Sequence, residues 1–252
     1  PWCCAPFGSP QAGSLRRRWA WTCTARWSLG SCLWQEEVEA ELQQLGEGKV
    51  SYFRADITNP EDIKALVQET REKLGKIDIL INNAGGPAGG SFDAFDDEDW
   101  QKAFELDLLS YIRVIREVLP DLKKEGGRII NIASSSIKQP IPGLILSNTF
   151  RLGIVGLAKS LAEELAPYNI LVNTVAPGRI ATDRVAFLDQ LKADKQGLSR
   201  EQVEEASKKQ IPLGRYGKPE EFAKVVAFLV SDANTYLTGS SFLVDGGMIK
   251  SI

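Results

Sequence analysis

The sequence contains no histidine among its 252 residues. This absence excludes serine–histidine–aspartate and cysteine–histidine triads, a histidine general base and histidine metal ligands. Cysteine is scarce too: the four cysteines are Cys3, Cys4, Cys23 and Cys32, and none stands in a C-x-x-C pair. We therefore expect neither a metal site nor a disulfide framework, and the cysteine-free remainder fits a reducing, cytoplasmic setting.

The chain also lacks long apolar runs and an excess of basic charge. No stretch approaches the roughly 18 consecutive apolar residues of a membrane-spanning helix, so no membrane association is predicted. The formal net charge of −3 leaves no broad positive field that would attract nucleic acid. The length suits one large α/β domain with a substantial core.

Residues 1–35 differ in composition from the rest of the chain. They hold all four cysteines and five of the six tryptophans, and they contain arginine but no lysine, aspartate or glutamate. Three interpretations are open: an arginine-bearing mitochondrial transit peptide, an unusual native arm, or out-of-frame translation of the gene. We favour the third, since a one-base shift of Trp19–Ser28 permits an ordinary first strand; the coding DNA would decide. Residues 36–252 are expected to form a single domain.

From residue 36 onward, apolar runs alternate with helical patterns. Asn59 and Pro60, followed by two acidic residues, are typical of a helix N-terminus. Residues 179–216 read as a polar loop with two short helices, of the kind that forms a lid or substrate loop. Strands are expected over 50–55, 77–81, 129–132, 170–175 and 241–244, and helices over 38–45, 60–74, 97–120, 146–167 and 219–229.

The stretch 129–178 reads as strand, loop, helix and strand, which is a βαβ unit of a parallel sheet. Ser134, Ser135 and Ser136 follow its first strand. In open α/β sheets ligands bind at the carboxyl ends of the strands, so these serines are candidate site residues. The alternative is a serine-rich turn that only caps the following helix.

Several ordered motifs resemble the short-chain dehydrogenase/reductase family, from about residue 36 to 247, and most closely its 3-oxoacyl-carrier-protein reductases. The motifs are Asp56 after a strand, Asn82-Asn83-Ala84-Gly85, Trp100, Asn131-Ile132-Ala133-Ser134, Pro177-Gly178 with Ile180 and Thr182, Gly217-Lys218-Pro219-Glu220-Glu221, and Asp245-Gly246-Gly247. The resemblance implies a three-layer, doubly wound, Rossmann-like parallel sheet that binds NAD or NADP, with no means of telling the two apart.

The resemblance also implies which residues hold the cofactor. Asp56 and Ile57 would flank the adenine, and the others would line the cofactor toward the nicotinamide. Glycines permit close backbone approach, and a threonine hydroxyl can donate to a carboxamide or phosphate oxygen. The cofactor-binding residues expected in this way are Asp56, Ile57, Asn83, Ala84, Gly85, Ile132, Arg151, Pro177, Gly178, Ile180 and Thr182.

One departure from the family lies at its glycine-rich loop. Such folds bind the diphosphate at a glycine-rich turn between the first strand and helix, and Gly8, Gly13 and Gly30 do not have the family's spacing. The N-terminal strand–helix–strand thus reads as missing or garbled. We expect weakened dinucleotide binding, and an unpaired apolar edge on the strand at 77–81.

The second departure concerns the catalytic residues. The family places a serine, a tyrosine 13 positions later and a lysine four after that; here these places hold Ser134, Ser147 and Arg151, and the family's helix asparagine is Asp107. A phenol has a pKa of about 10, which a neighbouring cation can lower, whereas an aliphatic hydroxyl is a far weaker acid. Arginine keeps the positive charge but does not deprotonate to relay a proton.

Other groups could compensate for these replacements. Tyr111 and Lys138 lie four residues after Asp107 and Ser134, although each is better explained as structural or solvated. Asp107 could act as an acid if burial raised its pKa, and a salt bridge with Arg151 is the alternative we prefer.

Two functions follow from the resemblance. The first is an NAD(P)-dependent oxidoreductase acting on a small carbonyl or secondary-alcohol substrate through a modified site of Ser134, Ser147, Arg151 and Asp107. The second is a catalytically weak or inactive relative that serves as a nucleotide-binding or oligomeric module. By resemblance alone, the helices at 97–120 and 146–167 and the last strand would form a homodimer or homotetramer.

Overall fold

The computed structural model describes residues 19–23, 39–40, 42–44 and 48–251. Within these residues a parallel sheet has five strands in the order β1-β2-β3-β4-β5. Its strands are β1 (Trp19–Cys23), β2 (Ile79–Asn83), β3 (Gly127–Ile132), β4 (Ile170–Pro177) and β5 (Ser241–Val244). The predicted α/β class with a parallel sheet is thereby confirmed, with small shifts in the strand boundaries.

The prediction of an unpaired edge on the strand after residue 77 is wrong. β1 pairs in parallel with β2 along its whole length, from Trp19 opposite Ile79 to Cys23 opposite Asn83. A strand ladder is made by backbone groups, so an unusual composition is no obstacle to pairing. The prediction about an out-of-frame segment stays a prediction, because most of residues 1–35 lie outside the described part of the chain.

The predicted strand at 50–55 is also wrong. These residues follow no regular secondary structure and do not join the sheet. β-branched and aromatic residues favour a strand only where a neighbouring strand offers backbone partners and packing. The side chain of Gln43 instead accepts a hydrogen bond from the amide of Val50 at 3.2 Å.

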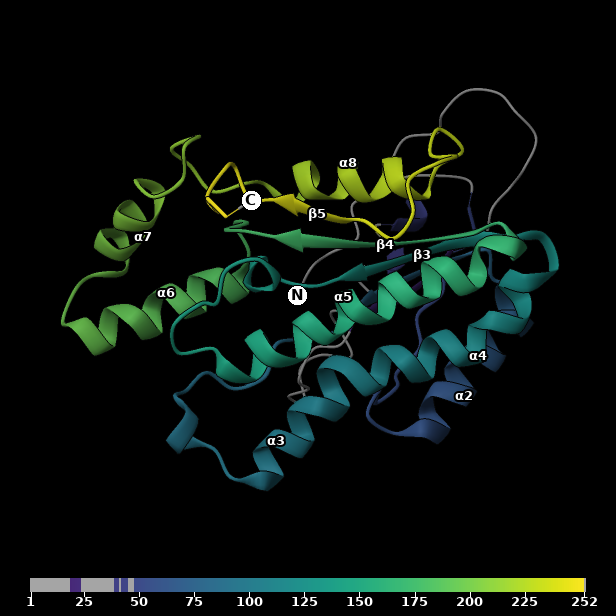
Figure 1. The fold of residues 1–252 in the computed structure, drawn as a ribbon, viewed down its shortest axis with the longest axis horizontal. Coiled ribbons are helices and arrows are strands. Elements are labelled where there is room, and N and C mark those ends of the chain that lie inside the picture. Colours follow the sequence, from purple (N-terminus) through teal and green to yellow (C-terminus); the bar gives the residue numbers. More distant parts are fainter. Residues whose placement is uncertain (1–18, 24–38, 41, 45–47, 252) are drawn as a thin grey trace.

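Helices cover both faces of the sheet (Figure 1). On one face, α2 (Pro60–Leu74), α4 (Ser110–Glu125) and α5 (Ile145–Leu165) pack on apolar side chains of the strands, among them Leu80 and Ile129. On the other, α8 (Pro219–Val230) packs on Ile81 and Ile130. Adjacent strand residues thus face opposite layers, which is why these strands are apolar on both sides.

Helix α2 shows how local sequence sets the boundaries of an element. The Asn59 side chain accepts a hydrogen bond from the amide of Glu61 at 2.9 Å, and Pro60 takes the first helical position. At the other end Gly75 adopts a φ of 84°, a conformation that glycine allows without strain. The predicted start of this helix is confirmed.

The predicted helix at 97–120 is interrupted. It consists of α3 (Asp97–Phe104), a π-helical turn (Glu105–Leu109) and α4. π-Helical turns within α-helices frequently lie at functional sites, and this turn contains Asp107. The short 3₁₀ turns of the described chain are Phe92–Ala94, Ser135–Ile137 and Ala166–Tyr168.

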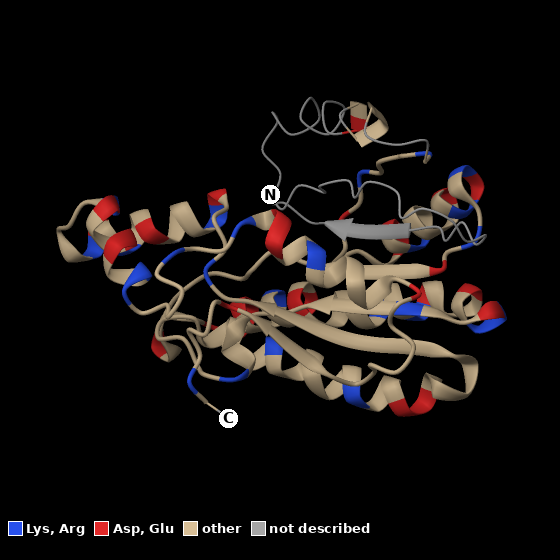
Figure 2. Cartoon of the chain, turned by 90° about the horizontal axis from the view of Figure 1, so that it is seen from above, with Lys and Arg blue, Asp and Glu red and all other residues tan. Residues whose placement is uncertain are grey.

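Helices α6 (Asp183–Gln196) and α7 (Arg200–Lys208) form an arm beyond the carboxyl ends of the strands (Figure 1). This agrees with the two short helices predicted within 179–216. Both signs of charge are interspersed over the helices, whereas the strands carry almost none (Figure 2). No helix among the described residues is long and apolar enough to span a membrane.

Candidate active site

The buried guanidinium of Arg151 joins the carboxyl ends of β2 and β3. Its Nη1 donates to the carbonyl oxygen of Ile132 at 3.0 Å, and its Nη2 donates to those of Ala84 at 3.0 Å and Gly85 at 3.2 Å. Only 5% of the Arg151 side chain is exposed. The planar fork of arginine fits several acceptors at once, so this residue fixes α5 over both strand ends.

Asp107 supplies the counter-charge for this guanidinium. One of its carboxylate oxygens lies 3.0 Å from Arg151 Nη2, and its side chain is fully buried. Burial raises the pKa of Asp107 to about 6, while the positive charges of Arg151 and Arg184 act against that rise. The preferred alternative, a salt bridge, is therefore formed, and the raised pKa required by the other alternative is present as well.

Tyr111 completes the cluster from α4. Its hydroxyl donates to the carbonyl oxygen of Ile132 at 2.8 Å and accepts from the amide of Ala84 at 3.0 Å and from Arg151 Nη1 at 3.2 Å. Burial raises the pKa of Tyr111 above its ordinary value. The phenol is thus a neutral bridge between two strands, in agreement with the structural explanation given to it from the sequence.

Ser134 and Ser147 lie at opposite ends of the loop that joins β3 to α5. Ser134 is half-buried, and its hydroxyl oxygen accepts from the amide of Ser136 at 3.2 Å. Ser147 is buried in the first turn of α5, one helical turn before Arg151. Ser134 therefore caps a short 3₁₀ turn and not the following helix, whose N-cap is Leu144, so the alternative interpretation is wrong on this point. Its position directly after β3 keeps it at the carboxyl edge of the sheet.

Residues predicted to hold the cofactor come together at the end of β2. Ile57 packs in one apolar cluster with Ala84, Tyr111 and Ile154. The preceding Asp56 is exposed, and its carboxylate accepts from the amide and the hydroxyl of Thr58 at 2.9 and 2.7 Å. Asn83 is the last residue of β2 and is buried. The turn at Asp56 thus lies beside the start of the Ala84–Gly85 loop.

The second set of predicted cofactor residues follows β4, which ends at Pro177. A Cβ atom at Gly178 would lie 2.5 Å from the Cβ of Asp245, so only glycine fits there. Ile180 is buried and bridges to Gly217, and Thr182 caps α6 by accepting from the amide of Val185 at 3.5 Å. These contacts position the segment; the binding roles of all these residues stay predictions.

One residue that the sequence did not single out faces the same region. Arg184, on α6, places Nη2 3.5 Å from the carbonyl oxygen of Pro87 and 3.5 Å from the point where a Cβ atom on Gly86 would lie. Its position two residues after Thr182 is the only sequence signal for it.

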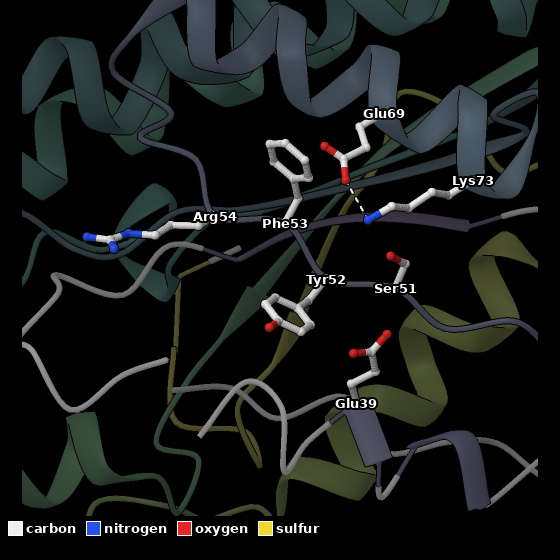
Figure 3. A pocket seen from close by; sticks show the side chains of 7 residues that line it. All are labelled: Glu39, Ser51, Tyr52, Phe53, Arg54, Glu69 and Lys73. Carbon is white, nitrogen blue, oxygen red and sulfur yellow. Dashed lines mark ion pairs between the residues drawn. The ribbon is translucent and has the colours of Figure 1, made fainter. Parts of the chain in front are cut away.

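A cavity of about 340 Å³ lies elsewhere, between the 51–54 segment and α2 (Figure 3). It is lined by Glu39, Ser51, Tyr52, Phe53, Arg54, Glu69 and Lys73, and Glu69 and Lys73 pair across 2.5 Å. It shares no residue with the Asp107–Arg151 cluster. Among the described residues no group of three or more cysteine, aspartate and glutamate side chains is placed to hold a metal ion.

Several of the known proteins that this chain resembles are reductases. A family model described as enoyl-(acyl carrier protein) reductase matches residues 27–249. The 3-oxoacyl-[acyl-carrier-protein] reductase of Thermotoga maritima is 37% identical over 203 residues, which cover 80% of this chain and 78% of that protein.

Solved structures agree with these sequence matches. YwfH, an NADPH-dependent reductase involved in bacilysin biosynthesis, superposes with a TM-score of 0.84 at 29% identity, covering 94% of this chain and all of that one. L-Sorbose reductase from Gluconobacter frateurii, complexed with NADPH and L-sorbose, gives a TM-score of 0.81 at 30% identity, covering 86% of this chain and 83% of that one.

Proposed function

The chain belongs to the short-chain dehydrogenase/reductase family, and on this premise we propose that it is an NAD(P)-dependent oxidoreductase that interconverts a small carbonyl compound and a secondary alcohol. The observation that carries the proposal is the placement of Ser134, Ser147 and Arg151 around the carboxyl ends of β2 and β3. Ligands of open α/β sheets bind at that edge.

The residues present fit a nicotinamide dinucleotide. Thr182 offers a hydroxyl donor, Gly85 permits close backbone approach, and Asp56 is exposed three residues before the N-cap of α2. Both solved relatives described above carry NADPH in their names, so NADPH is the first cofactor to test and NADH the second. Bound there, the dinucleotide would exchange a hydride with the carbonyl carbon.

The protein's own part in the reaction is to hold the substrate oxygen and its proton. The Ser134 hydroxyl donates a hydrogen bond to that oxygen, and Ser147 provides a second hydroxyl from α5. An aliphatic hydroxyl is too weak an acid to carry the charge that a phenol can carry. General acid–base catalysis contributes roughly 10²- to 10⁴-fold, so turnover is expected to be slow.

Arg151 acts mainly as a positioning residue in this proposal. Its two terminal nitrogens already meet three carbonyl oxygens, the Tyr111 hydroxyl and the Asp107 carboxylate. A bond from Arg151 to the ribose hydroxyls stays a prediction, and it would require one of these partners to be exchanged.

The same observation favours the second candidate function, a nucleotide-binding or oligomeric module without turnover. A guanidinium that is wholly committed to the fold leaves the site without a proton relay. Oligomerisation through the helices at 97–120 and 146–167 and through β5 stays a proposal drawn from resemblance. Leu152 of α5 is 54% exposed.

Fluorescence titration with NADPH and NADH, followed by a carbonyl-reduction screen, tests the proposal. Binding with turnover that falls at least tenfold in Ser134→Ala supports the enzyme. The matched control is Ser160→Ala, which removes an exposed hydroxyl on α5 and should leave turnover unchanged. Binding without turnover favours the module, and absence of binding contradicts both functions.

A further inference from the structure

Arg184 extends from α6 across the loop that follows β2. Its Nη2 lies 3.5 Å from the carbonyl oxygen of Pro87, and its guanidinium carbon lies 5.8 Å from the ring centre of Phe187. The residue remains accessible to solvent. The guanidinium is therefore held between the Gly85–Gly86 segment and the arm, where a ligand on the strand ends can reach it.

The charge of Arg184 is not matched by a close carboxylate. The carboxylate of Asp107 interacts electrostatically with both arginines. Its direct ion pair, however, is with Arg151 at 3.0 Å. Within the part of the chain that the structure describes, Arg184 forms no ion pair. One negative charge thus faces two positive ones, and the surplus lies on the accessible guanidinium.

A dinucleotide brings two negative phosphates to the strand ends. Rossmann-type folds meet this charge with backbone amides of a glycine-rich loop after the first strand. The sequence has no glycines at the required spacing for such a loop. An accessible cation near the strand ends is therefore a candidate partner for part of the phosphate charge.

We propose that Arg184 binds the diphosphate of the dinucleotide, across the Gly85–Gly86 loop, and so supplies the contact that the missing glycine motif would make. This proposal rests on the proposed function, because it assumes a dinucleotide at the strand ends. Arginine presents paired donors that match phosphate oxygens. Gly86 has no side chain beside the guanidinium; a Cβ atom added there would lie 3.5 Å from Arg184 Nη2. The space next to the guanidinium is therefore open to a phosphate.

The same guanidinium could instead recognise a carboxylate of the substrate. Proximity to the loop after β2 favours the cofactor, because that loop follows directly on Asn83 and Ala84, which lie among the predicted cofactor residues. Binding experiments with fragments of the cofactor, in the absence of substrate, distinguish the cofactor diphosphate from a substrate carboxylate.

Isothermal titration of the full chain with ADP-ribose and with adenosine tests the proposal without any turnover. Charge-assisted hydrogen bonds contribute about 1.5–3 kcal/mol, so Arg184→Met should weaken ADP-ribose binding roughly 10- to 150-fold. Adenosine, which lacks the diphosphate, should bind both proteins equally. Arg184→Lys should recover part of the loss, because lysine keeps the charge without the fork.

Arg200→Met is the matched control, since it removes an exposed positive charge from the neighbouring helix α7. It should leave ADP-ribose affinity within about twofold, as expected for a screened surface charge. Thermal unfolding of each variant verifies that the fold is retained.

The possible outcomes distinguish the role of Arg184 from the proposed oxidoreductase function. A wild-type chain that binds neither NADPH nor ADP-ribose overturns both. Unchanged ADP-ribose affinity in Arg184→Met overturns only the role of Arg184, and so does an equal loss in Arg200→Met. Arg184→Met could also raise the KM for an anionic carbonyl substrate, leave that for a neutral one unchanged and leave ADP-ribose affinity unchanged. That result would overturn the proposal and assign Arg184 to substrate binding.

Discussion

Arg151 and Arg184 carry the same charged group near the same carboxylate, yet their surroundings differ. Arg151 is buried in α5, and protein acceptors meet both of its terminal nitrogens. Arg184 is accessible on α6, and its one hydrogen bond within the described residues is a long one, 3.5 Å from the carbonyl oxygen of Pro87. One guanidinium is therefore part of the scaffold, and the other is available to a ligand.

The difference shows that residue type alone does not define a role in this site. A buried cation must be paired and hydrogen-bonded, because an unpaired one costs several kcal/mol. Asp107, Tyr111 and three carbonyl groups meet that requirement for Arg151. An accessible cation is hydrated and needs no such partners, so Arg184 can exchange water for phosphate.

The largest effect is expected from combining Ser147→Tyr with Arg151→Lys, which introduces the residues that the resemblance predicts for these positions. A phenol beside a lysine should raise kcat by up to about 10⁴-fold relative to the wild-type chain. Ser147→Tyr alone should gain much less, because the guanidinium of Arg151 is engaged with the protein and does not relay protons. Steady-state kinetics on the best carbonyl substrate measures both. A full gain in the single variant would contradict the scaffold role of Arg151.

Methionine substitutions compare the two arginines directly. Arg151→Met leaves Asp107 buried without its partner and should lower the free energy of unfolding by about 3–5 kcal/mol. Arg184→Met should change it by no more than about 0.5 kcal/mol, as at other accessible positions. Urea denaturation followed by circular dichroism gives both values. Equal losses would mean that Arg184 is also structural.

The pH dependence of stability reports on Asp107. Its folded pKa of about 6 lies above the ordinary value of 3.8. The folded state therefore holds a proton that the unfolded chain releases, so this group favours folding below pH 4 and loses that contribution as pH rises through 6. A shift of about 2 units corresponds to ~3 kcal/mol.

Asp107→Asn removes this titration. Between pH 4 and 7 the stability of the variant relative to the wild-type chain should rise by up to that amount, measured by urea denaturation at several pH values. Parallel curves for the two proteins would show that Asp107 does not titrate in this range.

The smallest effect is expected for Tyr111→Phe. The variant keeps the ring but removes the hydroxyl that meets Ile132, Ala84 and Arg151, leaving the Ala84 amide without its acceptor. A buried unsatisfied group costs about 1–3 kcal/mol, and thermal unfolding would detect the loss. Tyr168→Phe, at a partly exposed tyrosine, is the matched control and should be nearly neutral.

Much of the fold could be predicted because its signals are local. Asn59 and Pro60 begin α2, and the apolar runs of β2, β3 and β4 are long enough to require burial on both faces. The predicted strand at 50–55 was wrong because strand formation also depends on a partner from elsewhere in the chain. Its β-prone residues were judged without knowing whether a neighbouring strand would pair with them, and that depends on distant parts of the chain.

The candidate site was predictable in its positions and less so in its contacts. Motif spacing placed Ser134, Ser147, Arg151 and Asp107 in one region, and the Asp107–Arg151 pair was among the alternatives considered. The three carbonyl acceptors of Arg151 were not predictable, because backbone carbonyls carry no residue signature. Arg184 was missed since nothing in its local sequence shows that α6 turns it toward the Gly86 loop.

The sequence by itself determined the family, the parallel α/β architecture and the absence of histidine chemistry, because these depend on residue identity and spacing. Only the tertiary structure decided which charges are paired and which are accessible. Burial and the distance between atoms from separate elements set those energies, as in the 3.0 Å pair between a π-helical turn and α5. Two arginines that are chemically alike thus became a buried structural group and a candidate ligand contact.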